Sequence, residues 1–195
     1  MRNRILTEAL HQMNEQGLRF TTAGLAHELA VSKRTIYEYF PSKESLMGAV
    51  FETILADLYQ QVSRIFQDES LDPIEKLQSL MNASPKALGP LSDRIIVDAK
   101  RLLPKEWAKF EDFFTDKWMK IEQVIHQGEQ EGLFRPVNLN ILRKMYMGTI
   151  NELGDYQFLS QNSCTFSSTM ATTIDILIFG SINQDGRGKN QPPCS

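Results

Sequence analysis

Apolar residues recur at intervals of three and four along almost the whole chain, and no stretch alternates apolar and polar residues over the length of a strand. In the first such segment, 2–16, one helical face would carry Ile5, Leu6, Ala9, Leu10 and Met13. This spacing predicts an all-α fold. No apolar run approaches the roughly 18–20 residues that a membrane-spanning helix needs. The first residues also lack the pattern of a secretory signal, so we expect a cytoplasmic protein without a membrane partner.

Hydroxyl, glycine and proline residues divide the first part of the chain into short helices. Gly17 is placed to end the first helix in a left-handed turn. Thr21 and Thr22 are both suited to cap the second segment, and Ser32 is suited to cap the third. Pro41 ends the third segment, because the residue before a proline is disfavoured in the α region. The sequence therefore predicts three helices within about 40 residues.

A much longer apolar stripe follows and predicts a fourth helix over 42–68, about 40 Å in length. Proline and glycine separate the remaining segments. Further helices are expected at 72–81, 91–103, 105–131, 139–159 and 167–182. Residues 183–195 are polar and rich in glycine and proline, so a disordered tail is expected there.

Residues 17–46 have the layout of a helix-turn-helix, with a tight turn at Ala30 and Val31 between two short helices. Lys33, Arg34 and Lys43 are accompanied within 31–43 by a single acidic residue, Glu38, although the whole chain has a net charge of -3. A locally basic patch on an acidic chain favours a specific nucleic-acid contact over general binding to polyanions.

The same segment resembles the DNA-binding domain of the TetR family of bacterial transcriptional regulators. The resemblance covers about residues 4–50 and rests on the order and spacing of its motif residues: Thr21-Thr22, Leu25-Ala26, Val31-Ser32-x-x-Thr35-Ile36-Tyr37-x-Tyr39-Phe40 and Lys43-Glu44-x-Leu46. Residues 131–136, EGLFRP, resemble the usual entry to the family's penultimate helix. Ala30 is a departure, because the family usually has glycine in this turn, and alanine at positive φ lowers stability.

The resemblance implies an N-terminal three-helix DNA-binding domain over 1–47 and a larger helical domain over 48–182 that binds a ligand and dimerises. Its DNA contacts would be made by residues of the two short helices and the start of the fourth: Thr21, Thr22, Ser32, Lys33, Arg34, Thr35, Tyr37, Tyr39 and Lys43. Arg34 is the candidate for a bidentate contact to guanine. Alternatives remain for four of these residues: an ion pair of Arg34 with Glu38, a packing role for Tyr37 or Tyr39, and an exposed Lys43 with no partner.

The helix expected at 105–131 is unusually aromatic, and some of its residues are candidates for lining a cavity for a small, largely apolar ligand, although plain core packing is the alternative for each. The candidate pocket residues are Trp107, Phe110, Phe114, Trp118, Met119 and Tyr146. The last two helices each carry an apolar stripe that would form a four-helix interface between two copies. The candidate interface residues are Leu142, Thr149, Leu153, Tyr156, Met170, Ile174, Leu177 and Ile178.

These features predict a homodimeric repressor on a palindromic DNA operator, released by a small-molecule ligand. A DNA-binding architectural or cell-division protein of the same fold, with a filled core and no ligand, is the alternative. No glycine-rich phosphate loop or nucleophile motif suggests an enzyme or a cofactor. The two cysteines, Cys164 and Cys194, are not spaced to bind a metal.

Overall fold

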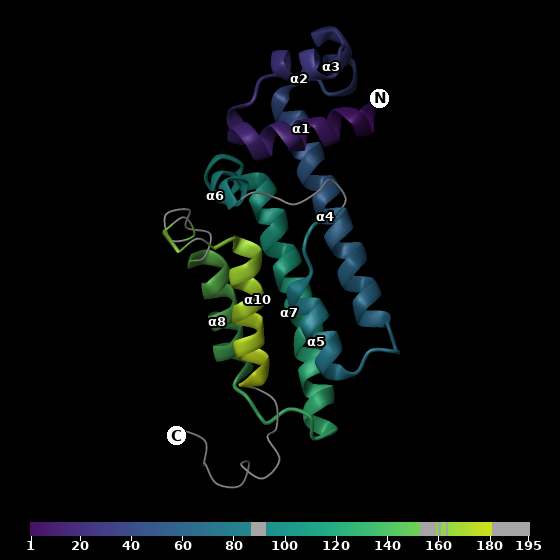
Figure 1. The fold of residues 1–195 in the computed structure, drawn as a ribbon. Coiled ribbons are helices and arrows are strands. Elements are labelled where there is room, and N and C mark those ends of the chain that lie inside the picture. Colours follow the sequence, from purple (N-terminus) through teal and green to yellow (C-terminus); the bar gives the residue numbers. More distant parts are fainter. Residues whose placement is uncertain (87–92, 153–158, 160, 163, 181–195) are drawn as a thin grey trace. The chain divides into compact units, whose positions relative to one another are not determined.

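The computed structural model describes residues 1–86, 93–152, 159, 161–162 and 164–180. The elements of these residues are helices, which confirms the all-α prediction (Figure 1). They are α1 (Arg2–Gln16), the 3-10 helix η1 (Gly17–Arg19), α2 (Thr22–Glu28), α3 (Lys33–Tyr39), α4 (Lys43–Gln67), α5 (Pro73–Asn82), α6 (Asp93–Leu102), α7 (Pro104–Gln130), α8 (Leu139–Glu152) and α10 (Phe166–Phe179). None of the helices in these residues is long and apolar enough to cross a lipid bilayer.

The helix ends follow the caps and breakers of the sequence. The N-terminal helices begin and end within one or two residues of the predicted positions. The described helix α8 ends at Glu152. Residues 153–158 of the helix predicted over 139–159 lie outside the described residues. The predicted tail, 183–195, lies outside the described residues.

The chain divides into two compact units. The first comprises Met1–Gln61 and Ser84–Phe113, and the second comprises Val62–Ala83, Phe114–Leu153 and the described part of Gln157–Ser195. Both α4 and α7 contribute residues to each unit. The division therefore falls inside α4 and α7, and the domain boundary expected at residue 47 stays a prediction.

The first unit has a core built by its short helices. α1 packs against η1 and α2, and α2 packs against α3. The fully or almost fully buried residues of this core include Ile5, Leu6, Ala9, Leu10, Met13, Phe20, Leu25, Ile36 and Phe40. Because this core uses one face of each short helix, the remaining faces of α2 and α3 are available to solvent.

The turn between α2 and α3 is a Schellman motif. The Val31 N–H donates to the Ala26 carbonyl at 2.9 Å, and the Ala30 N–H donates to the His27 carbonyl at 3.0 Å. Ala30 occupies the left-handed position of this motif, with φ of 53°. The positive φ that the sequence predicts to be unfavourable for alanine is therefore present.

The end of α7 is built in the same way, but with glycine. Gly132 has φ of 75°, and its N–H donates to the Glu129 carbonyl while Leu133 N–H donates to the Gly128 carbonyl at 2.8 Å. The chain thus contains one pattern of backbone hydrogen bonds twice, once with alanine and once with glycine at the left-handed residue.

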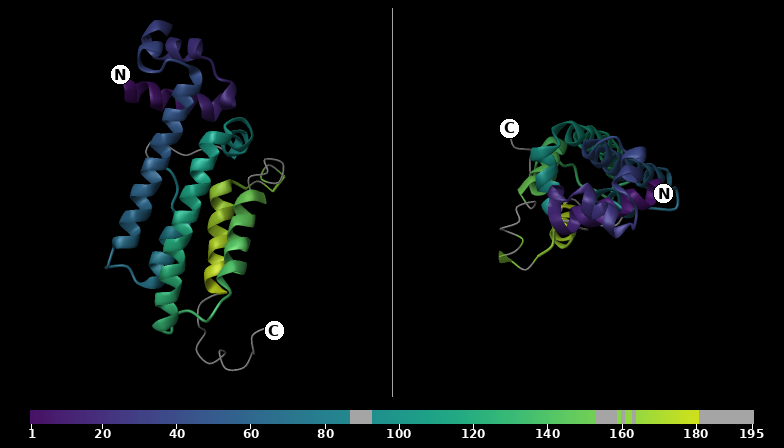
Figure 2. Two further views of the ribbon diagram at one scale, coloured as in Figure 1. Left: turned by 180° about the vertical axis from the view of Figure 1, so that it is seen from behind. Right: turned by 90° about the horizontal axis from the view of Figure 1, so that it is seen from above.

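In the second unit, α10 packs against α5 and α8, and the two views of Figure 2 together with Figure 1 show α8 and α10 side by side. The α5 helix begins with a capping box in which Asp72 accepts from the N–H groups of Ile74 and Glu75, both at 2.8 Å. The core of this unit contains Leu77, Leu80, Trp118, Ile121, Ile174 and Ile178.

Candidate nucleic-acid interface

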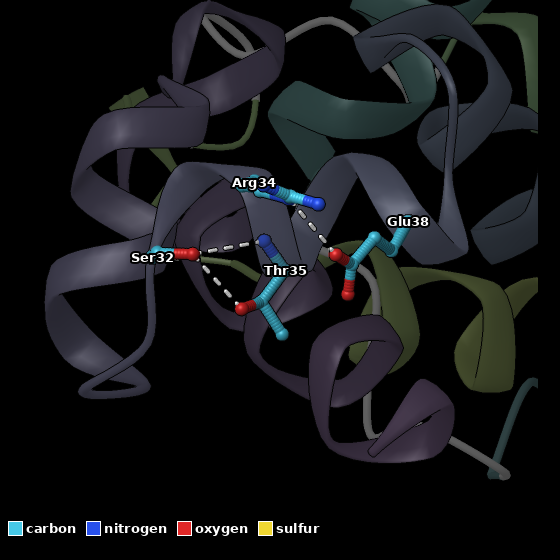
Figure 3. A network of polar contacts seen from close by, with 4 residues as sticks. All are labelled: Ser32, Arg34, Thr35 and Glu38. Carbon is cyan, nitrogen blue, oxygen red and sulfur yellow. Dashed lines mark hydrogen bonds and ion pairs between the residues drawn. The ribbon is translucent and has the colours of Figure 1, made fainter.

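The first turn of α3 is fixed by Ser32. Its Oγ accepts from the Thr35 N–H at 3.0 Å and lies 2.9 Å from the Thr35 hydroxyl. Figure 3 shows these two contacts at the start of the helix. Ser32 therefore acts as the predicted cap, and its hydroxyl is engaged within the chain.

The two faces of α3 differ sharply in exposure. Ile36 is buried in the core and Phe40, directly after the helix, is buried as well. Lys33 and Arg34 are exposed, as are Tyr37 and Tyr39, both of which the sequence places among the DNA contacts. The exposure of Tyr39 does not support the alternative that it packs in the core.

Arg34 forms the ion pair that the i,i+4 spacing allows. Its Nε lies 3.3 Å from the Glu38 Oε1, and the two side chains are 88% and 59% exposed (Figure 3). Such an exposed pair stabilises a helix by only a few tenths of a kcal/mol, about 0.3–0.5. The guanidinium can therefore exchange Glu38 for another acceptor at little cost.

The second helix begins close to α3. Thr21 accepts the Gly24 N–H at 3.0 Å, as predicted for a capping residue. The hydroxyl of Thr22, the first residue of α2, lies 3.3 Å from the phenol oxygen of Tyr37. This bond brings two predicted DNA contacts, from two different helices, to the same place on the surface.

Lys43 is not the exposed lysine without a partner that one interpretation of the sequence describes, and its contact with DNA stays a prediction. Its Nζ donates to the Leu18 carbonyl at 2.7 Å and lies 4.6 Å from the centroid of the Phe20 ring. Partial burial lowers the pKa of Lys43, and the adjacent Glu44 opposes this shift. Lys43 therefore joins the start of α4 to η1, a structural role that the sequence did not indicate.

The candidate pocket residues are divided between the two units. In the first unit Trp107 stacks on Phe110 with ring centroids 6.0 Å apart. In the second unit Trp118 stacks on Tyr146 with centroids 6.1 Å apart. Phe114 also belongs to the second unit, where Met119 is half exposed. A ligand pocket at these residues stays a prediction.

Most described members of the predicted dimer stripe are covered by their own chain. The buried ones are Leu142, Met170, Ile174, Leu177 and Ile178, Thr149 is half-buried, and Leu153 and Tyr156 lie outside the described residues. The large apolar side chains that α8 and α10 leave exposed are instead Ile141, Met145, Ile176 and Phe179. The interface predicted from the sequence stays a prediction.

Sequence reasoning also missed Lys117. This lysine follows Phe110 and Phe113 on the apolar stripe of α7 and precedes Ile121 by one turn, so it takes a core position. It is 3% exposed. A lysine at helical spacing within an apolar stripe was the signal available in the sequence.

Comparison with known proteins decides the family. Residues 5–50 match the family described as bacterial regulatory proteins, tetR family, and they contain the capped α2–α3 unit and its exposed basic face. Residues 5–50 form a DNA-binding domain of the TetR family, and the chain as a whole resembles regulators that carry this domain. It is a helix-turn-helix DNA-binding transcriptional regulator.

Similar proteins extend the match beyond this domain. The uncharacterized HTH-type transcriptional regulator YvaF of Bacillus subtilis is 28% identical over 180 residues, covering 92% of this chain and 95% of YvaF. The nucleoid occlusion factor SlmA of Aliivibrio fischeri is 29% identical over 153 residues, covering 74% of this chain and 78% of SlmA. A solved structure from Saccharomonospora viridis, assigned as a transcriptional regulator and bound to choline, has a TM-score of 0.73 at 21% identity, covering 94% and 98% of the two chains.

Proposed function

We propose that this TetR-family protein is a homodimeric repressor that binds a palindromic operator and leaves it when a small, largely apolar ligand binds. The exposed face of α3 carries the DNA-binding part of the proposal. It presents Lys33 and Arg34 in the first turn of a capped helix whose opposite face, at Ile36, is buried. A helix of this kind fits the major groove with its N-terminal residues at the base edges.

The contacts divide by chemistry. Arg34 has the fork of donors that pairs with the O6 and N7 of guanine. Thr22 and Tyr37, which share a hydrogen bond, present their hydroxyls for neighbouring phosphate oxygens, and such contacts fix the register of the protein on DNA. Lys43 adds a positive charge near the DNA phosphate backbone, although its Nζ already donates to the Leu18 carbonyl of the protein.

A homodimer is supported by the exposed apolar side chains of α8 and α10. Ile176 is 67% exposed and Phe179 is 65% exposed, one turn apart on α10. Ile141 and Met145 are similarly exposed one turn apart on α8, which packs against α10. Exposed apolar residues grouped in this way are typical of contacts between protein subunits. Two copies related by a two-fold axis would match a palindromic operator.

The dimer can be tested at one position on α10. Ile176→Lys places a charge next to Phe179 on the exposed apolar face of α10. The variant is expected to be a monomer by size-exclusion chromatography with light scattering. Ala171→Lys changes an exposed residue of the same helix and should leave the dimer intact. A dimeric Ile176→Lys protein at micromolar concentration would contradict an interface on this face.

DNA binding is tested by gel shift with the DNA upstream of the protein's own gene, across a series of salt concentrations. The wild-type protein should bind one sequence tightly and lose affinity steeply with salt. The double variant Lys33→Ala/Arg34→Ala should lose specific binding, whereas Lys144→Ala, at an exposed lysine of α8, should not. Full operator binding by the double variant would refute the assignment of α3.

Glu38 offers a more selective test of Arg34. Glu38→Gln removes the ion pair and one negative charge from the proposed interface. We expect about a three- to tenfold gain in operator affinity, since the guanidinium is released and a carboxylate near phosphates is repelled. An unchanged or weaker affinity would mean that Arg34 does not face DNA.

The similarity to SlmA favours a second candidate, a DNA-binding protein of the same fold that acts in cell division without a ligand. The choline complex of the Saccharomonospora viridis protein favours the ligand-responsive form. Release of the bound operator by an added small molecule separates the two. A protein whose operator complex withstands a broad set of apolar and amphiphilic compounds would support the second candidate.

A further inference from the structure

The second unit contains a buried ammonium group that the DNA-binding role does not use. Lys117 on α7 is 3% exposed. Its Nζ donates to the Tyr146 Oη on α8 at 3.1 Å and to the Met81 carbonyl in the last turn of α5 at 3.3 Å. Tyr146 in turn donates its hydroxyl to the same Met81 carbonyl at 3.0 Å. Three helices therefore meet at one polar centre inside a helical unit.

The acceptors around this ammonium are all uncharged. In the described part of the chain no carboxylate forms an ion pair with Lys117, and the Tyr146 ring is its aromatic neighbour, with the centroid 5.7 Å from Nζ. The Met81 carbonyl is one of the last carbonyls of α5, where a cation is favoured by the helix dipole. That interaction offsets only part of the unfavourable burial of a charge.

The hydrogen bonds of the group are also incomplete. A lysine ammonium has three N–H donors, and the structure provides Lys117 with two acceptors, Tyr146 and Met81. The neighbours of these residues along two of the helices are apolar and buried: Leu80 precedes Met81 on α5, and Trp118 follows Lys117 on α7. Among the described residues, one of the three donors of this buried group thus has no acceptor.

Resting on the ligand-responsive function proposed above, we propose that Lys117 and Tyr146 bind the carboxylate of an otherwise apolar ligand. A carboxylate accepts the third N–H of Lys117 and supplies the negative charge that the protein omits. It also competes with the Met81 carbonyl for the Tyr146 hydroxyl. The ligand class is a monocarboxylic acid with an apolar body, since the buried ring of Trp118 stacks on Tyr146 and Leu80 beside Met81 is buried and apolar.

The position of Met81 links this site to α4. Three residues after Met81, the Ser84 carbonyl accepts from the Gln61 Nε2 at 3.0 Å, and the Lys86 N–H donates to the Asp57 Oδ2 at 2.6 Å. The segment that continues α5 is therefore fastened to α4, the helix that starts at the DNA-binding domain.

A single-tryptophan protein provides the readout. The chain has two tryptophans, so Trp107→Phe leaves Trp118, which stacks on Tyr146. In this background, fluorescence titration compares decanoate, 1-decanol and decyltrimethylammonium below their micelle concentrations. Decanoate should bind at least tenfold more tightly than either of the other two, which share its chain length but not its charge.

Variants then locate the carboxylate contact. Lys117→Gln keeps a donor for the Met81 carbonyl but removes the charge, and it should weaken decanoate binding at least tenfold without changing 1-decanol binding. Tyr146→Phe, which keeps the ring, should weaken decanoate binding several-fold. Lys144→Gln, at an exposed lysine of the same helix as Tyr146, should change neither. Circular dichroism establishes that each variant is folded.

Three results would overturn the proposal: no saturable binding of decanoate, equal affinity for decanoate and 1-decanol, or unchanged decanoate binding in both folded Lys117→Gln and Tyr146→Phe. Operator binding is measured in parallel by gel shift, so that failure of the carboxylate site can be told apart from failure of the proposed repressor function. If the protein binds its operator but not decanoate, the proposed carboxylate site is refuted and the proposed regulator is not. Decanoate binding that depends on Lys117 in a protein without a specific operator would leave the site standing and refute the repressor.

Discussion

Replacement of Ala30 by glycine should stabilise the DNA-binding domain. Ala30 has φ of 53° at the left-handed position of the motif that ends α2. The chain uses Gly132, with φ of 75°, at the equivalent position after α7. Glycine has no Cβ and adopts this conformation without steric cost, so Ala30→Gly removes strain while keeping both backbone hydrogen bonds of the turn.

The magnitude is the difference between two terms. A left-handed conformation is unfavourable for an L-residue with a Cβ by about 1–2 kcal/mol. Glycine increases the conformational entropy of the unfolded chain, which lowers stability by about 0.4–1 kcal/mol. The free energy of unfolding of the domain that contains Ala30 should therefore rise by about 0.5–1 kcal/mol.

Urea unfolding followed by circular dichroism measures the effect. The matched control is Ala56→Gly, the same chemical change at an exposed position within α4, where glycine should lower stability by about 1 kcal/mol. The two variants should thus shift the unfolding midpoint in opposite directions. If Ala30→Gly lowers stability as Ala56→Gly does, the account of strain at this turn is wrong.

Three further substitutions test other contacts, each by the same urea unfolding. Lys43→Met keeps the aliphatic stem but leaves the Leu18 carbonyl without its donor, and it should lower the free energy of unfolding by about 1–2 kcal/mol; no change would mean that this hydrogen bond contributes nothing. Gly128→Ala places a Cβ against the buried ring of Phe134, and a loss of about 1–3 kcal/mol is expected, whereas a gain would show that the ring can move away. Asp72→Ala removes the capping box of α5 and should cost about 1 kcal/mol, with Asp72→Asn restoring most of it if the cap is the cause.

Helix caps, helix ends and ion pairs within one helix could be predicted from the sequence, because they depend on residues close together in the chain. Thr21 and Ser32 accept the backbone N–H groups expected of capping residues, and Pro41 follows the end of α3. The Arg34–Glu38 pair also follows from spacing along one helix. These features depend on residues within four positions of one another, so no knowledge of the tertiary fold was needed to predict them.

Contacts between distant segments were not predictable in the same way. The partner of Lys43 is a backbone carbonyl 25 residues earlier in the chain, and a carbonyl has no residue-specific signal. The acceptors of Lys117 include another carbonyl, on α5. In each case the lysine is visible in the sequence, but its partner is defined only once the helices are packed.

The apolar faces of α10 show a different limit. Ile174 and Ile178 form one face and Ile176 and Phe179 another, and both are hydrophobic. The structure buries the first face and exposes the second. A helix that is apolar on two faces has no periodicity that tells core from surface, which is why the predicted interface residues fell on the covered face.

The anchoring of Lys43 limits the ways in which the DNA-binding domain can move. The first turn of α4 is held to η1 by the hydrogen bond to the Leu18 carbonyl and by the contact with the Phe20 ring, and η1 packs against α1. The start of α4 is thus joined to η1 by a side-chain contact as well as by the covalent chain through Pro41. If the proposed ligand response moves the start of α4, we expect α1, α2 and α3 to move with it as one body, so that the shape of the exposed face of α3 is preserved.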